Sequence, residues 1–404
     1  GDVYKRQDLK QLLWILTVSS DGAVPVQFKV THGNIEDSGT HIETWKVLRQ
    51  LVGTPRFLYI ADSKLCTSEN LRYIDGKQGA FLTPLPGSRK EDAQFRAWLS
   101  DHEPQWQEVA HFVRPGQLLS CADVIRAIES PIPEVNGFRL VWFFSSHKCQ
   151  RDADKRQDAI LRATKQLEKL RERLKGPRCR FKHLKTVTQA VEKILDSSRC
   201  RRWIDYTVER THELKYRFET RKRRGSRIKR CIGSVMRFQL TWKPNVENIR
   251  KDSKSDGITP LATNRRDLSP LQLYNAYHRN HSFLELRHDL LKNTLQAVPV
   301  YIHSVARFEA FLLLEYFAIT VHALIERGLR SAMRNRQLEQ IPLYPEAREC
   351  KAPTAARLLD VFDHLAVHDL MEDRKSIQRF QPQLTQLQLD LLNLLGMPAD
   401  IYTC

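Results

Sequence analysis

The sequence lacks the cysteine and histidine patterns that mark a structural metal site. Its eight cysteines are scattered, with no Cys-x-x-Cys pair and therefore no pair of cysteines that could join two histidines in a zinc site. This distribution argues against a zinc ribbon and against a disulfide framework. Dispersed thiols of this kind fit a protein of the reducing cytoplasm.

The sequence also lacks a long apolar run without charges. Its longest apolar stretch, which starts at Ala310, reads AFLLLEYFAITVHALIERGL and is interrupted by Glu315 and His322. A membrane span needs roughly 18 charge-poor residues, so this stretch falls short. We predict a buried core helix here and no membrane partner.

Positive charge is abundant. The 404 residues include 65 Lys and Arg against 47 Asp and Glu, which gives a formal net charge of +18. With 41% hydrophobic residues, the chain can build two or three packed domains. The charge points to a polyanionic partner, although it does not separate DNA, RNA and anionic lipid, and a basic surface without a ligand is the alternative.

The first residues do not read as part of a fold. Asp2 to Gln7 spell DVYKRQ, which resembles one reading frame of the transposon-end adapter used in sequencing libraries. We interpret residues 1–7 as an artefact and take Asp8 as the first residue that belongs to the protein.

Residues 8–95 follow a recognisable order of elements. Two β-rich runs flank Asp21-Gly22, a strong hairpin signal, and Asn34 to Val52 has the spacing of an amphipathic helix that ends at Gly53. The run FLYIAD is typical of a buried strand, with Asp62 at its carboxyl end. A short helix over 68–75 and the strand AFLTPL complete the order. Hairpin, helix, strand, helix, strand is the order of the ribonuclease H-like fold after its central first strand, which carries the first metal-binding carboxylate. That strand has no match in this chain.

Residues 96–254 are basic, and their leucine and alanine spacing predicts a mainly helical insertion domain that closes with the strand-like run RFQLTWKPN. Two clusters of cations stand out, RCRFKHLK from Arg178 and RKRRGSRIKR from Arg221. A solvated charged face is the simpler interpretation of either cluster alone, but two clusters in one basic chain favour phosphate contact. The candidates for DNA binding in the second cluster are Arg221, Lys222, Arg223, Arg224 and Arg227.

The remaining sequence returns to globular character. SDGITPLATN predicts a turn and a short strand, and Ser269-Pro270 is a good start for a long helix. We assign residues 255–335 to the second part of the core and residues 336–404 to a C-terminal helical region. The fold class expected from the whole chain is α/β, with a ribonuclease H-like core of a mixed sheet flanked by helices and interrupted by the insertion.

Two acids are candidates for metal-assisted chemistry on a phosphodiester. Such chemistry needs carboxylates from distant parts of the chain to hold two Mg²⁺ ions. Asp62 ends a strand, as a metal ligand of an open α/β site does, but a strand-ending Asp is also a common helix cap. Glu285 and Lys292 lie seven residues apart on the long helix, so they share one face. An ion pair in solvent is the alternative for these two residues, as it is for Arg279 and Arg287.

At this point the chain resembles a known family, the bacterial insertion-sequence transposases with an Asp-Asp-Glu triad. The resemblance runs over nearly the whole chain from Asp8, and these segments carry it in order: DLKQLLWILTVSSDGAVPV, HGNIEDSGTHIETW, FLYIADSKLCTSENLRYI, SDGITPLATN, YHRNHSFLELRHDLLKN, ALIERGLR and LYPEAREC. It implies that Asp62 is the second acid of the triad and Glu285 the third. Lys292 matches the last residue of the Tyr-Arg-Glu-Lys signature.

The signature helix departs from the family pattern in two places. Tyr277 lies eight residues before Glu285 instead of seven, and position 281 is His where the pattern has Arg. We therefore carry over Glu285 and Lys292, and treat Tyr277 and Arg279 as neighbouring candidates for DNA contact. The family's first Asp has no match, since Asp21 and Asp256 both stand in Asp-Gly turns.

The resemblance implies a bacterial DNA transposase that cuts and joins the ends of its element with Mg²⁺ or Mn²⁺. Its partners would be double-stranded DNA, both terminal inverted repeats and target DNA, and a second copy of itself in a homodimeric paired-end complex. It would lie in the cytoplasm and on the nucleoid when bound to DNA. Without the first carboxylate we expect this chain to keep DNA affinity and lose most catalysis. The alternatives are a non-catalytic DNA-binding protein derived from a transposase and, less favoured, an RNA-processing nuclease of the same fold.

Overall fold

The computed structural model describes residues 12–32, 37–113, 121–132, 136–176, 179–220, 227–294, 304–372 and 375–402. The adapter-like residues 1–7 lie outside this part of the chain. Two compact units divide the molecule, one made of residues 1–60 and 274–404 and the other of residues 61–273.

The N-terminal hairpin is confirmed. Strands β1 (Leu12–Val18) and β2 (Pro25–His32) pair antiparallel as a sheet of their own. Gly22 in the turn has a φ of +84°, a backbone conformation that glycine adopts without strain. Helix α1 (His41–Val52) follows a 3-10 turn and ends at Gly53 in the left-handed region, as expected. The first residues of the expected helix, 34–36, lie outside the described residues.

The central sheet has six strands in the order β3-β4-β10-β7-β6-β5. Strands β4, β10, β7, β6 and β5 each pair antiparallel with the next one in this order. Strand β3 lies beside β4, and helix α2 connects these two strands along the chain. The strands and adjoining helices are β3 (Leu58–Ile60), α2 (Ser68–Gly76), β4 (Ala80–Pro84), α3 (Lys90–Asp101), β5 (Gln107–Phe112), β6 (Asp123–Glu129), β7 (Arg139–Ser145) and β10 (Ile258–Thr263). The core includes Phe95 of α3, stacked on Trp142 of β7 with ring centroids 3.7 Å apart.

The architecture is therefore α/β, a mixed sheet flanked by helices. The expected order of hairpin, helix, strand, helix and strand is present at the start of the chain. Two features differ from the expectation: β1 and β2 form a separate two-stranded sheet, and β5, β6 and β7 extend the central sheet inside the span predicted as an insertion. The chain leaves the central sheet only after β7, at Ser146, and re-enters it at β10.

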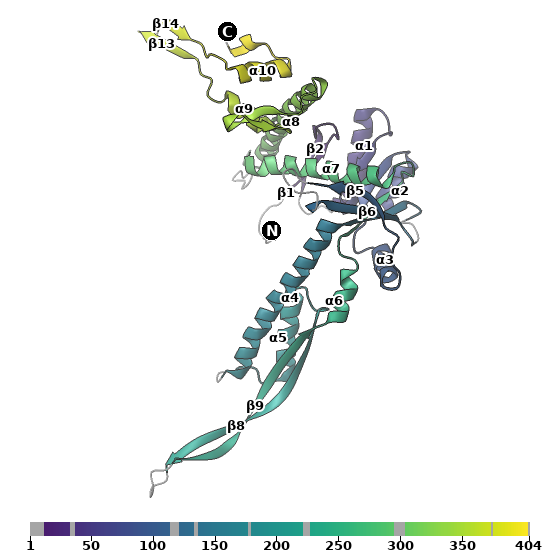
Figure 1. Ribbon diagram of the computed structural model, residues 1–404, viewed down its shortest axis with the longest axis vertical. Coiled ribbons are helices and arrows are strands. Elements are labelled where there is room, and N and C mark those ends of the chain that lie inside the picture. The colour runs from purple at the N-terminus through teal and green to yellow at the C-terminus, as the bar shows by residue number, and fades with distance from the viewer. Residues whose placement is uncertain are drawn as a thin grey trace. The chain divides into compact units, whose positions relative to one another are not determined.

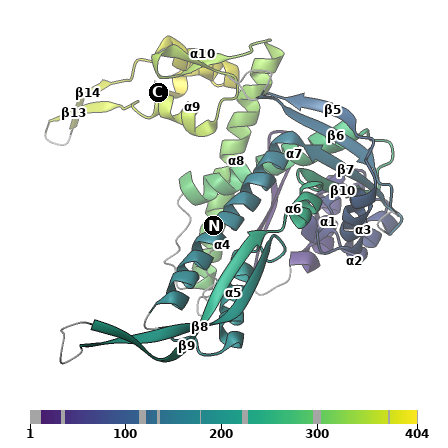
Figure 2. The same cartoon turned by 60° about the horizontal axis from the view of Figure 1, so that its bottom comes forward.

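The insertion, predicted as mainly helical, is helical only in part. Helices α4 (Ser146–Lys175), α5 (Leu184–Ser197) and α6 (Val246–Ser253) are accompanied by strands β8 (Ile204–Thr220) and β9 (Arg227–Pro244), which pair along their whole length. Strands occupy nearly as many residues of the span 96–254 as helices do. Leu167, Val191 and Leu240 belong to a core that joins α4, α5 and the near half of the β8–β9 pair. Both views show α4 and α5 side by side, with the far half of the pair extending beyond them (Figures 1 and 2).

The long helix predicted at Ser269-Pro270 is confirmed as α7 (Pro270–Asp289). Ser269 Oγ accepts a hydrogen bond from the Gln272 amide at 3.3 Å, and Gln272 Oε1 accepts one from the Ser269 amide at 2.8 Å. These two bonds form a reciprocal cap that fixes the start of the helix. A π-helical turn, Leu290–Thr294, continues α7.

The C-terminal region is not purely helical, contrary to the prediction for residues 336–404. After α8 (Val305–Asn335) come two short antiparallel pairs and two short helices. They are β11 (Ile341–Tyr344), β12 (Arg348–Cys350), α9 (Ala355–Phe362), β13 (His368–Glu372), β14 (Lys375–Phe380) and α10 (Gln386–Leu395). Leu329, Met333, Leu343 and Leu391 are in the core that ties α8 to these elements.

Helix α8 is the predicted core helix, but it buries only one face. Ile319 and Ala323 are fully buried, and Phe28 of β2 stacks on Tyr316 with ring centroids 4.6 Å apart. The other face leaves large apolar side chains in solvent, namely Leu314, Phe317, Val321 and Leu324. By length and composition alone, the helix from Ala306 to Asn335 could cross a membrane, a test that core helices of soluble proteins also pass.

Candidate metal and nucleic-acid sites

Asp62 follows β3 and is exposed. Its Oδ1 accepts a hydrogen bond from the Lys64 amide at 3.0 Å, which makes it the N-cap of the 3-10 helix Ser63–Leu65. Its carbonyl accepts one from Thr83 Oγ1 of β4 at 2.7 Å. Asp62 is thus a cap, as the simpler interpretation held, and the cap uses only one of its two carboxylate oxygens.

Glu285 lies on α7 with an exposed side chain, and Lys292 is exposed in the π-helical turn that follows. A π turn hydrogen-bonds to the fifth residue instead of the fourth, so the helical period changes between these two residues. The π turn therefore changes the alignment of these two side chains from the one that a continuous α-helix would give. Single π turns are frequent at functional sites, which keeps this segment a candidate.

His288 separates Glu285 from Lys292 and faces an apolar wall. Its ring meets the Trp14 ring edge-on, with centroids 5.9 Å apart. Burial, with a smaller contribution from Lys292, lowers the pKa of His288 below its ordinary value, against the opposing effect of Glu285. The imidazole is therefore neutral at pH 7.

The structure corrects the interpretation of Arg287. Its side chain is 95% buried, and its guanidinium donates to the carbonyls of Ala23 and Gly22, each at 3.1 Å. The same group forms an ion pair with the buried carboxylate of Glu326 at 2.9 Å. Arg287 is therefore not a surface residue, and its burial and its partners argue against contact with a phosphate. It fastens α7 to the hairpin turn and to α8.

Tyr277 is also buried, at 8% exposure, with its ring edge-on to His278. This burial argues against contact with a DNA backbone. The side chain of Arg279 lies outside the described part of the structure. Asp62 belongs to the unit of residues 61–273, whereas Glu285, Lys292, Tyr277 and Arg287 belong to the other unit.

The chemistry of the candidate acids suits a hard cation. Mg²⁺ and Mn²⁺ prefer carboxylate oxygens, and both Asp62 and Glu285 offer them at exposed positions. Within the described ranges, no three His, Cys, Asp or Glu side chains are grouped so that they could hold a metal ion. A complete metal site would therefore need the two acids together with a further ligand.

The second cluster of cations falls at the far end of the β8–β9 pair. Arg221, Lys222, Arg223 and Arg224 lie outside the described residues, as does the side chain of Arg227. The adjoining described residues Lys215, Arg217, Lys229 and Arg230 are all exposed, and Arg217 lies directly across from Arg230 in the register. The sequence analysis did not identify Lys215 and Arg217 as candidates for DNA contact. The pattern that could have identified them is the alternate spacing of their cations along a strand.

The first cluster lies in the link between α4 and α5. Arg180, Lys182 and Lys185 are exposed there, while Arg178 is outside the described residues. Among the described residues, these three side chains have no ion pair, so they remain accessible to an anion. The cluster adds positive charge to the same unit as the β8–β9 pair.

Comparison of the chain with protein-family models and with curated proteins finds no match. The functional assignment therefore depends on the geometry and charge of the residues described above. The observation with the most direct chemical meaning is the long basic strand pair.

Proposed function

We propose that this chain is a DNA transposase of the Asp-Asp-Glu type, with a ribonuclease H-like core, which binds duplex DNA and serves metal-dependent cleavage and strand transfer at the ends of an insertion sequence. The observation that carries the proposal is the β8–β9 ribbon, defined as Ile204–Thr220 paired with Arg227–Pro244. A two-stranded ribbon is one of the shapes that the major groove of DNA admits.

The far half of the ribbon has the composition of a nucleic-acid contact. Along β8, the cations Lys215 and Arg217 alternate with exposed apolar side chains at Leu214 and Tyr216, and a further exposed cation, Lys229, lies on β9. The ammonium of Lys229 lies 4.1 Å from the centre of the Tyr216 ring. Cations supply phosphate contacts, and apolar side chains can meet the edges of bases.

The carboxylates supply the catalytic half of the proposal. Asp62 and Glu285 would hold Mg²⁺ or Mn²⁺, which would stabilise charge at the attacked phosphorus and lower the pKa of a bound water. Asp62 can serve as ligand and cap together, because the cap occupies only Oδ1. Lys292 would neutralise a neighbouring phosphate.

The alternative is a non-catalytic DNA-binding protein derived from a transposase. The ribbon supports this alternative equally, because DNA contact needs no carboxylate. The two functions differ in one measurement, metal-dependent nicking, which only the enzyme shows. An RNA-processing nuclease would instead bind duplex RNA more tightly than duplex DNA.

Neutralising the ribbon should weaken DNA binding. In the triple variant Lys215→Gln, Arg217→Gln, Arg230→Gln, we expect duplex affinity to fall at least about tenfold at 0.1 M salt. The slope of log K against log salt should become shallower by up to about one for each phosphate that the variant no longer neutralises. Fluorescence anisotropy with a labelled duplex at several salt concentrations measures both quantities.

The matched control removes the same charge from another surface of the same unit. Lys165, Lys169 and Lys193 are exposed on α4 and α5, and their change to glutamine should leave the affinity within about twofold. Equal losses in the ribbon and control variants would mean that net charge alone binds DNA, and the ribbon would lose its role. An RNA duplex in the same titration tests the nuclease alternative.

We further propose that the exposed face of α8 joins two copies of the chain in a homodimer. Leu314, Phe317, Val321 and Leu324 recur at steps of three, four and three residues, the spacing of a coiled-coil seam. Leu314 alone leaves 67% of its surface exposed. An exposed apolar stripe of this kind usually marks an interaction surface.

A charge placed on this stripe should separate the copies. The double variant Leu314→Glu, Val321→Glu should raise the dimer dissociation constant at least about tenfold, because each carboxylate would have to be buried against an apolar surface. Sedimentation equilibrium measures the change. The control variant Leu161→Glu, Val246→Glu alters two exposed apolar residues of the other unit and should associate as the unchanged chain does. A wild-type chain that is monomeric at 0.1 mM would contradict the proposal.

A further inference from the structure

A cavity of about 890 Å³ lies within the unit of residues 61–273. Its walls come from α3, from one face of α4, from the turn after α5, and from the end of α6 with the turn that follows it. On α4 the lining residues Asp152, Lys155, Arg156, Ala159 and Arg162 recur at helical spacing, so a single face of this helix forms one wall. A second cavity of about 360 Å³ shares Arg199, Arg202, Trp203 and Asp252 with it.

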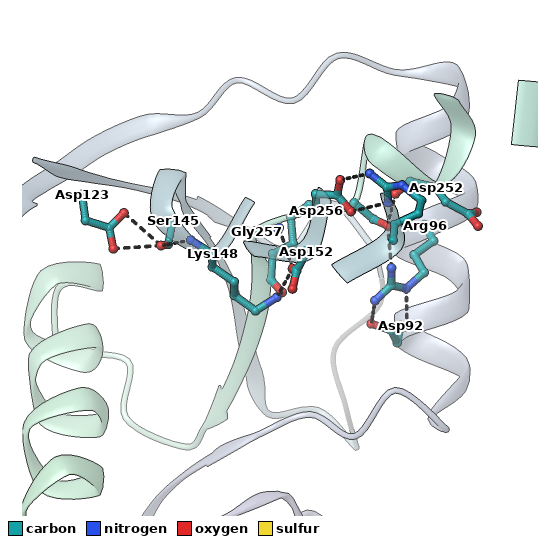
Figure 3. Close-up of polar contacts among 12 residues, drawn as sticks. Asp92, Arg96, Asp123, Ser145, Lys148, Asp152, Asp252, Asp256 and Gly257 are labelled. Carbon is teal, nitrogen blue, oxygen red and sulfur yellow. Dashed lines mark hydrogen bonds and ion pairs between the residues drawn. The ribbon is translucent and has the colours of Figure 1, made fainter. Parts of the chain in front are cut away.

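Cations outnumber carboxylates in the lining by eight to four. Each carboxylate already has a cationic partner: Asp92 pairs with Arg96, Asp256 with Arg156, Asp252 with Arg202, and Asp152 with Lys148, which is outside the lining. Figure 3 shows Lys148, Asp152 and Gly257 in contact, and Arg96 beside Asp92. The lining therefore keeps an excess of positive charge after all its acids are matched.

Three of the lining cations have no carboxylate or carbonyl partner for their side chains among the residues that the structure describes. They are Lys155 and Arg162 on α4 and Arg199 after α5. Lys155 nevertheless acts on its surroundings: burial raises the pKa of Asp152, but the hydrogen bonds from Lys148 and Gly257 and the charges of Lys148 and Lys155 together bring it below its ordinary value.

Ion pairs, hydrogen bonds and a ring contact join the walls of the cavity. At its base, the buried guanidinium of Arg156 pairs with both oxygens of Asp256 and lies over the Trp203 ring at 5.8 Å. The Trp203 indole N–H donates to Asp252 at 2.7 Å. Arg199 adopts a left-handed backbone with a φ of +55°, where glycine is the usual residue. A charged side chain is thus placed at the rim at some cost in backbone strain.

We propose that this cavity is a binding site for phosphate groups, with Lys155, Arg162 and Arg199 as the side chains that contact them. Guanidinium groups match phosphate oxygens in pairs, and an ammonium group adds a point charge. The volume exceeds what a single phosphate needs and suits a group of two or more. Two sources offer this chemistry, the backbone of a nucleic acid and a free polyphosphate. The inference goes beyond the proposed function, since it uses neither the ribbon nor Asp62 and Glu285.

The test titrates the full chain with two probes, inorganic pyrophosphate by calorimetry and a 12-base-pair duplex by anisotropy. The double variant Lys155→Gln, Arg162→Gln should bind at least one probe tenfold or more weakly, because each charge-assisted bond that is removed contributes about a factor of ten. Lys165→Gln, Lys169→Gln removes the same charge from α4 residues outside both cavities and should bind as the unchanged chain does. Melting curves of both variants verify that the unit is folded.

The two probes separate the sources. A loss confined to pyrophosphate identifies a free polyphosphate site, and a loss confined to the duplex identifies a nucleic-acid contact distinct from the ribbon. If the cavity variant binds both probes as well as its control does, or if the unchanged chain binds neither at millimolar concentration, the proposal is overturned. The ribbon variant serves as a reference, because it should lose duplex binding and keep pyrophosphate binding. The proposal for the ribbon and the proposal for the cavity can therefore be refuted separately.

Discussion

Replacing Arg287 with methionine should lower the free energy of unfolding by about 3 kcal/mol, because it leaves the buried carboxylate of Glu326 with only a longer ion pair, to Arg330 at 3.8 Å. Glu326 is 90% buried at its side chain, and its second oxygen accepts a hydrogen bond from the Ala355 amide at 3.1 Å at the start of α9. The two carbonyls of the hairpin turn that Arg287 binds would also lose their donor. Urea denaturation of the purified variant measures the loss.

A double variant separates this role from a contact with DNA. The double variant Arg287→Met, Glu326→Met removes both charges of the buried ion pair, so a large part of the lost stability should return. The control Arg327→Met breaks an exposed ion pair with Asp21 of the same hairpin turn and should cost about 1 kcal/mol or less. If Arg287→Met instead unfolds like the unchanged chain and loses DNA affinity, the side chain is a phosphate ligand after all.

Arg287 illustrates what a sequence pattern can and cannot reveal. Its position on α7 followed from local signals, since the cap at Ser269 and the spacing of apolar residues define the helix. Its partner Glu326 lies 39 residues further along the chain, and no local pattern indicates that the two side chains meet. A lone arginine is expected to be exposed, but Arg287 is buried because it forms a long-range ion pair with Glu326.

The strand-like run RFQLTWKPN is confirmed as the end of β9, but the rest of the ribbon was missed, for a different physical reason. Predictions of strands depend on apolar runs or on alternation that buries one face. From Thr211 onward, β8 is mostly charged and polar, and its far half has no core to face. Hydrogen bonding to β9 holds it instead. The same lack of an apolar face explains why the span was predicted as helical, since the leucine spacing of α4 was its strongest periodic signal.

Of the two roles predicted for Asp62, one is confirmed and the other is untested. The sequence placed it correctly after a strand, and the two interpretations offered for it, cap and metal ligand, were both open. The structure confirms the cap through the bond from the Lys64 amide. The role as a metal ligand stays a prediction, because it depends on Glu285 in the other unit.

A change of Asp62 to asparagine should separate these two roles. Asparagine caps a helix as well as aspartate does, so stability should stay within about 0.5 kcal/mol. Asparagine carries no charge and binds Mg²⁺ or Mn²⁺ more weakly, so metal-dependent nicking of a duplex with candidate element ends should fall at least about 100-fold. Asp62→Ala should lose both the nicking and about 1 kcal/mol of stability. Nicking is followed on gels, and stability by denaturation.

Asp62→Asn, Asp62→Ala and Glu285→Gln are compared with the unchanged 404-residue chain. The proposed pair of acids predicts that Asp62→Asn and Glu285→Gln each abolish metal-dependent cutting, and that DNA affinity persists in every variant because the ribbon is unchanged. If Asp62→Asn cuts as fast as the unchanged chain, Asp62 is a cap and nothing more. If the unchanged chain binds DNA but does not cut it with Mg²⁺ or Mn²⁺, the non-catalytic DNA-binding protein replaces the transposase, because DNA binding by the ribbon needs no carboxylate.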